Sequence, residues 1–478
     1  MKRLINFILP VQACNFKCHY CYIGQENRFN GEIGKLQYSQ EHMQRALTIS
    51  RMGGVCHFNI CGLGETLLAP YAAELAERLL ENGHFVSIVT NGTITEKIQA
   101  FMKFSQDFKK RLFFKFSFHY LELKRLGMLD LFFANVAAVS QAGISFTVEL
   151  TVNDETVPDI PKIKELCNER INAYCHVIES RNNNDGFSRL TKFTEKEHQK
   201  YWETFESPLF KFQQKHWMVK RREFCYAGDW VISLDAGSGW ITPCFAGGIP
   251  IQNVFEDITE DIHFMALGCN CQWTHCYAAY VLLTSGVIPD IDAPAYATFR
   301  NRCTSEGKEW LTPEIKKFFS EKLYEDNAVY SKQKKEWINI LNSIIYSQNY
   351  PTDIPNDILY SMQENLRKKG IKKVAVYGSR ETEMWMYGVL SRIGILCRYG
   401  LVLVDDLEDR KMYSVKNLIK YPVKRIWEHK SGLPLLMQQD KLPNVDLMIV
   451  CDTKEVSRCR QMLRGKVDRI AVWNELVE

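Results

Sequence analysis

The sequence predicts an α/β protein with parallel β-sheets and more than one domain. Over the first third of the chain, short apolar runs alternate with amphipathic stretches, and this alternation restarts near the C-terminus. The chain has 478 residues, which is too many for a single hydrophobic core. The six strand–helix units of the first third form either an open doubly wound sheet or a partial barrel, and periodicity alone leaves both open.

Six apolar runs are predicted as the strands of the first sheet. In chain order they are Leu4–Leu9, Val55–Cys61, Phe85–Val89, Phe113–Phe118, Ser145–Thr151 and Tyr174–Glu179. Helical periodicity predicts helices within Gln40–Met52, Tyr71–Glu81, Glu96–Phe108, Leu121–Gln141 and Pro158–Asn168. Gly83 and Gly143 follow two of these helices, where a left-handed residue commonly ends a helix.

Composition and charge exclude several classes of protein. Apolar residues make up 46% of the chain and charged residues 24%, yet no apolar run is long enough to span a bilayer. The net charge of +4 is too small to predict a nucleic-acid partner. The short apolar start is interpreted as the first strand, not a signal peptide, so we expect a cytoplasmic protein whose 16 cysteines serve metal binding, catalysis or packing.

Cys14, Cys18 and Cys21 form a C-x3-C-x2-C motif on the loop after the first strand. Three thiolates this close together suit three irons of a [4Fe–4S] cubane. No fourth cysteine of ferredoxin type follows, so one iron is left open, as a catalytic metal centre requires. A zinc knuckle is the structural alternative.

The motif resembles the signature of the radical S-adenosylmethionine (SAM) superfamily, including the aromatic Tyr20 before the last cysteine. The resemblance covers roughly residues 1–190 and implies a partial (β/α)6 barrel. It also implies that the amino and carboxylate groups of SAM chelate the open iron. One electron from the cluster then cleaves the sulfonium, and the resulting 5′-deoxyadenosyl radical removes a hydrogen atom from an unactivated C–H bond.

Further positions match the same family. Gly62-Leu63-Gly64-Glu65 resembles the glycine–glutamate motif that binds the methionine amino group, although Leu63 interrupts the usual glycine pair. Asn91 lies in the Thr90-Asn91-Gly92 segment that follows the third strand. Side chains at strand carboxyl ends line the mouth of a barrel. Four such residues are candidates either for SAM contact or for ordinary capping: Ser117, His119, Thr151 and Asn153.

A second cysteine group lies within residues 225–276. Cys225, Gly239 and Cys244 form a C-x13-G-x4-C pattern, which resembles the start of the SPASM and twitch extensions of the superfamily. Gly239 is expected to form a hairpin turn that brings the two cysteines together. The resemblance implies one auxiliary [4Fe–4S] cluster held by Cys225, Cys244, Cys271 and Cys276, with Cys269 as spare or substitute. A tetrahedral zinc site is the alternative.

The C-terminal region contains a predicted Rossmann-like unit. Strand-like runs occur at Lys373–Tyr377, Leu401–Val404, Leu447–Val450 and Ile470–Val472. The dinucleotide fingerprint is broken, because only Gly378 of its three glycines is present and Arg380 and Glu383 occupy the other positions. We expect this unit to bind a partner, a nucleotide or sugar part of a substrate, or nothing.

The predicted division has four parts. Residues 1–222 form the radical SAM partial barrel, 223–285 the auxiliary-cluster domain, 286–357 a helical connector and 358–478 the Rossmann-like domain.

The chemistry also requires a group that quenches the substrate radical. Cys175 and Asp229 are the candidates for this catalytic role, and His119, Glu149 and Arg181 are others near strand ends.

The leading hypothesis is a radical SAM oxidoreductase that oxidises or epimerises a small polar substrate, such as a sugar or sugar conjugate. Its auxiliary cluster accepts the electron, and a flavodoxin or ferredoxin supplies the reducing electron. The alternatives are a peptide- or protein-modifying maturase and a non-catalytic iron–sulfur relative.

Overall fold

The computed structural model describes most of residues 2–347 and short stretches beyond them. The gaps are at 27, 184–187, 220, 222, 246–249, 270, 272–274 and 277. The described stretches beyond 347 are 362, 364–366, 368–371, 373–378, 396–402, 435–436, 447–450 and 470–472. Contacts divide the chain into two compact units, Met1–Ser331 and Lys332–Glu478.

All six predicted strands of the first unit form. They are β1 Lys2–Leu9, β2 Val55–Gly62, β3 Phe85–Thr90, β4 Leu112–Phe118, β5 Ser145–Thr151 and β6 His176–Ile178. Each pairs in parallel with the next, so their order in the sheet is their order in the chain. A doubly wound sheet reverses its strand order at a switch point. The continuous order therefore selects the partial barrel.

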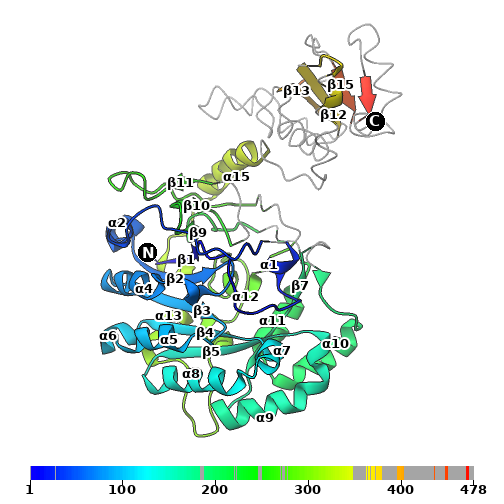
Figure 1. Cartoon of the computed structure of the whole chain (residues 1–478). Helices are drawn as coiled ribbons and strands as arrows, with labels where there is room; N and C mark the ends of the chain where they lie inside the picture. The colour runs from blue at the N-terminus through cyan, green and yellow to red at the C-terminus, as the bar shows by residue number, and fades with distance from the viewer. Residues whose placement is uncertain are drawn as a thin grey trace. The chain divides into compact units, whose positions relative to one another are not determined.

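Helices follow these strands on the outside of the sheet (Figure 1). They are α2 Gln40–Ala46, α3 Ile49–Met52, α4 Ala72–Glu81, α5 Thr95–Met102, α6 Gln106–Lys109, α7 Tyr120–Arg125, α8 Leu129–Gln141 and α9 Ile160–Ile171. The predicted helices 40–52 and 96–108 are each split in two. Thr48 and Ser105 cause the breaks, because each hydroxyl accepts a backbone N–H and starts a new helix.

The strands present different chemistry to their two faces. In β4, Phe116 and Phe118 contact Phe132 of α8 and belong to the hydrophobic core. Lys115 and Ser117 alternate with them and point to the opposite, inner face. The aromatic outer face holds the helices to the sheet, and the inner face of the barrel is left polar.

Three more strands extend this sheet beyond β1. β9 Val231–Asp235 pairs in parallel with β1, and β10 Trp240–Thr242 and β11 Gln252–Asn253 follow in antiparallel order. The segment predicted as an auxiliary domain therefore shares a nine-stranded sheet with the barrel. The four-part division of the chain itself stays a prediction.

Shorter elements complete the first unit. They are α1 Tyr22–Gln25, η1 Thr66–Leu68, η2 Asp154–Asp159, the β7 Arg181–Asn182 and β8 Ser188–Arg189 pair, α10 Glu195–Trp202, η3 Glu203–Phe205, α11 Pro208–His216, α12 Ala279–Leu282, η4 Tyr296–Phe299, α13 Pro313–Ser320 and α14 Leu323–Asp326. Phe318 and Phe319 of α13 pack against Phe85 and His57, at the amino ends of their strands. They close the barrel at that end.

The second unit contains α15 Lys332–Ser347 and a five-stranded parallel sheet. Its strands are β12 Lys373–Gly378, β13 Leu396–Val402, β14 Leu435–Leu436, β15 Leu447–Val450 and β16 Ile470–Val472, in the order β14-β13-β12-β15-β16. The four predicted strand regions are thus found. Arg380 and Glu383 lie outside the described residues, and the Rossmann-like assignment stays a prediction.

No helix in the described part of the chain combines the length and the apolar character needed to cross a lipid bilayer.

Candidate functional site

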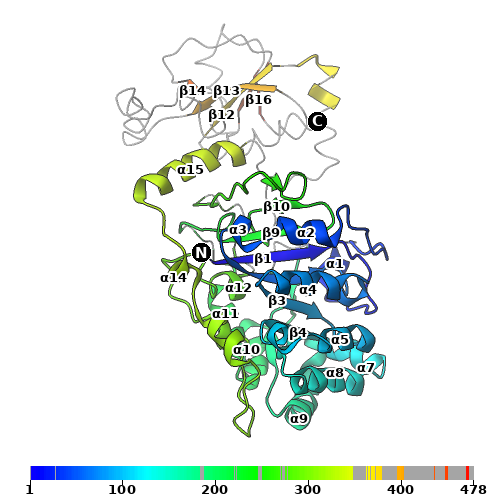
Figure 2. The same cartoon turned by 90° about the vertical axis from the view of Figure 1, so that its left-hand side faces the viewer.

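The three-cysteine loop lies at the carboxyl end of β1, which points toward α1 in Figure 2. The loop is fixed against the turn after β2, where the Glu65 N–H donates a hydrogen bond of 2.9 Å to the Ala13 carbonyl. A Cβ on Gly64 would lie 2.0 Å from that same carbonyl oxygen. Only glycine permits this approach, so the glycine–glutamate turn directly positions the residue before Cys14.

The thiols of Cys14, Cys18 and Cys21 line one cavity of about 280 Å³. Burial raises the pKa of Cys14 to about 11 and that of Cys18 to about 12, with repulsion between the neighbouring thiolates adding to the rise. Three crowded thiolates need bound cations to compensate their charge, and soft thiolates suit iron–sulfur clusters. The donor set therefore fits three irons of a cubane.

Glu65 is buried in the wall of the same cavity. Its carboxylate accepts hydrogen bonds from Thr90 Oγ1 at 2.6 Å and from the backbone N–H groups of Asn91 and Leu67 at 2.7 and 3.0 Å. Burial raises the pKa of Glu65, and these three donors oppose the rise. The arrangement holds a carboxylate in a fixed orientation where a ligand cation can meet it.

Most of the predicted SAM contacts gather around this cavity. Tyr20, Gly62, Gly64, Asn91, Ser117, His119 and Thr151 line it together with Glu65. The Tyr20 hydroxyl lies 3.0 Å from His119 Nδ1, and burial lowers the pKa of His119 to about 4, so the imidazole is neutral near pH 7. Asn153 is absent from the lining. Its Oδ1 accepts the Thr156 N–H at 3.1 Å and caps η2, which is the capping alternative.

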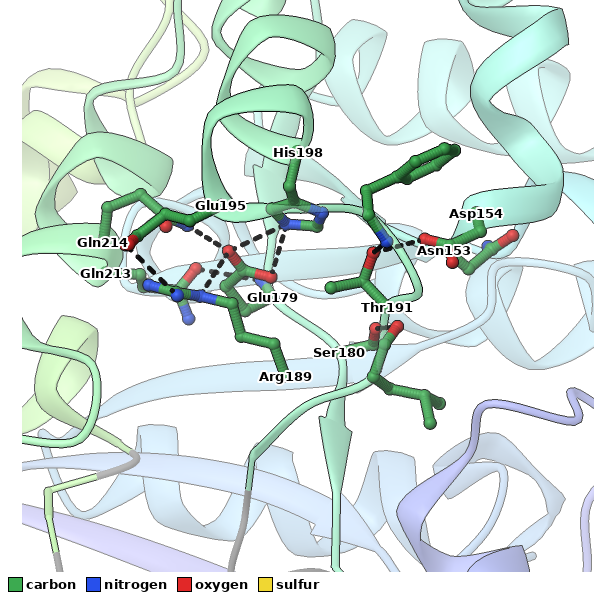
Figure 3. Close-up of polar contacts among 12 residues, drawn as sticks. Asn153, Asp154, Glu179, Ser180, Arg189, Thr191, Glu195, His198, Gln213 and Gln214 are labelled. Atoms are coloured by element: carbon green, nitrogen blue, oxygen red, sulfur yellow. Dashed lines mark hydrogen bonds and ion pairs between the residues drawn. The ribbon is translucent and has the colours of Figure 1, made fainter.

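Glu179, which follows β6 and lines the cavity, is the centre of a cluster of polar contacts (Figure 3). The carboxylate of Glu179 is fully buried and meets His198 Nε2 at 3.0 Å, Arg189 Nε at 3.6 Å and the side-chain amide of Gln214. The Glu179 N–H donates to Gln213 Oε1 at 3.1 Å. These contacts fix the strand end from which Glu179 itself and the next two residues face the cavity. This cluster could not be foreseen from the sequence, because its members come from four separate segments.

A second cavity, of about 450 Å³, adjoins the first inside the barrel. Tyr22, Cys61, Gly62, Val89, Arg181 and Tyr280 line both cavities. Polar residues from the inner faces of the strands, including Asn6, His57, Asn59, Cys61 and Lys115, line the second. We call it the interior cavity. The signal for it was present in the sequence, as polar residues at alternate positions of otherwise apolar strands.

The second cysteine group gathers near the β9–β10 hairpin. Gly239 has φ +87° between these strands and its N–H donates to the Asp235 carbonyl at 2.8 Å, so the predicted hairpin turn is present. Cys225 and Gly268 exchange two backbone hydrogen bonds, which brings Cys269 close to Cys225.

The thiols of this group lie close enough to influence one another. Burial raises the pKa of Cys225, and the thiolates of Cys244, Cys271 and Cys269 add to the rise. Burial likewise raises the pKa of Cys276, where Cys244, Cys225 and Cys271 contribute. Within the described ranges, no three His, Cys, Asp or Glu side chains converge tightly enough to hold a single metal ion. A cubane differs in that each thiolate binds its own iron.

The two predicted catalytic residues lie apart from both cavities. Cys175 is fully buried beside Cys167, and burial raises its pKa. Asp229 pairs with Arg3 at 3.1 Å and accepts a hydrogen bond from the Tyr330 hydroxyl. Neither side chain lines a described cavity. Their surroundings are those of packing and ion-pair residues, and a catalytic role for either stays a prediction.

Residues 8–113 match the family model described as Radical SAM superfamily. This segment contains the three-cysteine loop, Glu65 and Asn91. No curated protein matches the chain.

Several solved structures are similar to part of the chain. Streptococcus suis SuiB bound to S-adenosylmethionine has a TM-score of 0.40 at 16% identity, over 53% of this chain and 64% of SuiB. SuiB bound to its precursor peptide SuiA has a TM-score of 0.39 at 16% identity, over 54% of this chain and 63% of SuiB. Native anSMEcpe with bound AdoMet has a TM-score of 0.38 at 15% identity, over 54% of this chain and 80% of that protein. The chain thus spans less than two thirds of the length of SuiB.

Proposed function

We propose, on the match of residues 8–113 to the radical SAM superfamily model, that the chain cleaves SAM reductively and abstracts a hydrogen atom from a small polar substrate. The observation that carries the proposal is the convergence of three thiols and a buried carboxylate on one cavity that adjoins a second, polar one. The cofactors of this family are a [4Fe–4S] cluster and SAM.

Cys14, Cys18 and Cys21 would hold three irons of the cluster, and the fourth iron is left for SAM. When bound, cluster and cosubstrate supply the electron and the 5′-deoxyadenosyl radical that removes the hydrogen atom. The protein orients the ligand. Glu65 would pair with the methionine ammonium, Ser117 and Thr151 line the same cavity, and the Tyr20–His119 contact fixes the ring before the last cysteine.

Cys225, Cys244, Cys271 and Cys276 would hold an auxiliary [4Fe–4S] cluster of SPASM or twitch type, with Cys269 as the spare or substitute thiol. Four protein ligands leave no open iron, so such a cluster exchanges electrons and binds no substrate. This role supports an oxidoreductase reaction in which the auxiliary cluster accepts the electron of the substrate radical.

The interior cavity supports a small polar substrate, such as a sugar or sugar conjugate. Its volume of about 450 Å³ lies in the range of small-molecule sites, and its walls carry amide, hydroxyl and charged groups. The proposed clusters are compatible with a reducing compartment, so a cytoplasmic location and a flavodoxin or ferredoxin electron donor belong to the same proposal.

The test is anaerobic purification followed by measurement of iron, sulfide and zinc per chain and of 5′-deoxyadenosine after reduction with dithionite. We expect about eight irons for two cubanes. About four irons with bound zinc would reduce the second site to a structural role. Absence of deoxyadenosine from fully reconstituted protein would contradict the proposal. Stimulation by peptides and not by sugar nucleotides would replace the small substrate with a peptide.

A further inference from the structure

The interior cavity borders an unequal set of buried charges. Lys115 of β4 lines the cavity, and its Nζ lies 3.2 Å from Glu149 Oε2 on β5. On its other oxygen, Glu149 meets Arg300 Nη1 at 2.5 Å. The side chains of Lys115, Glu149 and Arg300 are 13%, 1% and 0% exposed. We call these three residues the cationic triad.

The cationic triad carries two positive charges and one negative charge. In the described part of the chain, Glu149 is the only acidic partner that forms an ion pair with either cation. The Nε and Nη2 atoms of Arg300 also make no hydrogen bond of standard geometry to a described residue. The rings of Tyr280 and Tyr296 lie 5.4 and 4.7 Å from the Arg300 guanidinium and offer their faces to it.

A buried excess of positive charge is costly unless an anion compensates it. Of the three residues, only Lys115 lines the interior cavity, and its side chain is the most exposed of the triad. Arg181, whose Nε donates to Asn183 Oδ1 at 2.7 Å, lines the wall that this cavity shares with the cavity of Cys14, Cys18 and Cys21. Glu26 and Arg28 also line the interior cavity, and they pair with each other at 3.0 Å. Together they add no net charge to the cavity wall.

We propose that the interior cavity binds a substrate through an oxyanion, a carboxylate or phosphoryl group, that pairs with Lys115. This inference rests on the proposed function and names the chemical class of its substrate. The anion anchors one end of the substrate against β4, while the wall shared with the cavity of Cys14, Cys18 and Cys21 faces its reacting end.

The experiment measures anion binding to the reconstituted holoenzyme without reductant, so SAM cleavage is not required. Inorganic pyrophosphate and malonate are titrated separately by calorimetry, which distinguishes a phosphoryl from a carboxylate ligand. Lys115→Gln should raise the dissociation constant of the preferred anion at least about tenfold, or 1.4 kcal/mol. Lys115→Arg keeps the charge and should retain most of the affinity.

Two further variants separate anion binding from general charge or folding effects. Lys162→Gln removes one charge and one lysine–glutamate pair at an exposed site and should leave anion binding unchanged. Glu149→Gln removes the competing carboxylate and should tighten anion binding about threefold or more, the opposite sign to Lys115→Gln. Should Lys115→Gln fail to fold, the gain in Glu149→Gln still tests the inference.

The anion-free holoenzyme provides a second readout. Lys115→Gln leaves the neutral Glu149–Arg300 pair, so its unfolding midpoint should not fall below that of the wild type. The rise in midpoint that the anion causes in the wild type should be lost. Equal anion affinity in wild type and Lys115→Gln would overturn the inference. Anion binding through Lys115 without deoxyadenosine formation would instead refute the proposed function and leave this site standing.

Discussion

The loop of Cys14, Cys18 and Cys21 and the cysteine group of residues 225–276 use the same side chain in different settings. The first places three thiols on one short loop at the carboxyl edge of the parallel strands, in the wall of a cavity with Glu65. The second gathers thiols from distant positions through a hairpin turn and a backbone bridge, and none of them lines a described cavity. Three ligands beside a cavity leave a metal open to a ligand, whereas four ligands away from it close the metal site.

Removing one thiol of the first loop is the most direct test of the difference between the two cysteine groups. Cys18→Ala should reduce 5′-deoxyadenosine formation at least about a thousandfold, because the three thiolates act as a unit. Iron should fall from about eight to about four per chain, with the second cluster intact. Deoxyadenosine formation is measured by chromatography and iron by colorimetry. Retention of both would contradict the assignment of the loop.

The next prediction concerns the contact by which the glycine–glutamate turn positions that loop. In Gly64→Ala the new Cβ would lie 2.0 Å from the Ala13 carbonyl oxygen, and that backbone atom cannot rotate away. We expect about a hundredfold loss of deoxyadenosine formation, from overpacking that displaces Cys14. Gly24→Ala is the matched control, because its Cβ would meet the Phe29 ring at an ordinary contact distance of 3.5 Å and Gly24 lines neither cavity. Equal activities of the two variants would refute close positioning by Gly64.

Glu65→Gln tests whether the cavity beside the first loop binds SAM through the Glu65 carboxylate. Loss of the carboxylate should raise the SAM dissociation constant about thirtyfold, or ~2 kcal/mol for a charge-assisted hydrogen bond. Iron content should stay at the wild-type value, since Glu65 binds no metal. Glu122→Gln is the control, because Glu122 accepts the Lys17 N–H at 2.9 Å beside the same loop but does not line the cavity. Equilibrium binding of labelled SAM measures both.

A smaller effect on SAM cleavage is expected from the second group. Cys276→Ala should lose about four irons per chain yet cleave SAM at a rate within about threefold of wild type, because the first cluster is complete. Turnover of the substrate should stop, since the electron acceptor is gone. Electron paramagnetic resonance of the reduced protein distinguishes which cluster remains. Loss of SAM cleavage to the level of Cys18→Ala would remove the distinction between the groups.

The smallest change tests which thiol is spare. Cys269→Ala should keep iron, SAM cleavage and substrate turnover at wild-type values, and Cys271→Ala, two positions away, should lose about four irons. The opposite result would exchange the roles of these two cysteines. Cys269 is exposed whereas Cys271 is partly buried, which favours the predicted assignment.

The sequence determined the features that depend on local pattern. Strand–helix alternation located all six strands of the barrel, and cysteine spacing singled out the loop whose three cysteines line one cavity. The turn at Gly239 was likewise predictable, since a positive φ in a hairpin favours glycine. The breaks at Thr48 and Ser105 were missed because their capping hydroxyls sit within stretches of continuous helical periodicity.

Features that require distant segments of the chain to meet are seen only in the tertiary structure. The pairing of β9 with β1, the Glu179–His198 contact and the cationic triad each join residues far apart in the chain. Cys175 and Asp229 are predicted as catalytic residues from their side-chain chemistry. In the structure Cys175 lies beside Cys167, and Asp229 pairs with Arg3. The periodicity of a strand shows that it has two faces. Which face encloses a cavity is decided by packing, because the helices cover the aromatic side and leave Lys115 and its polar neighbours inside the barrel.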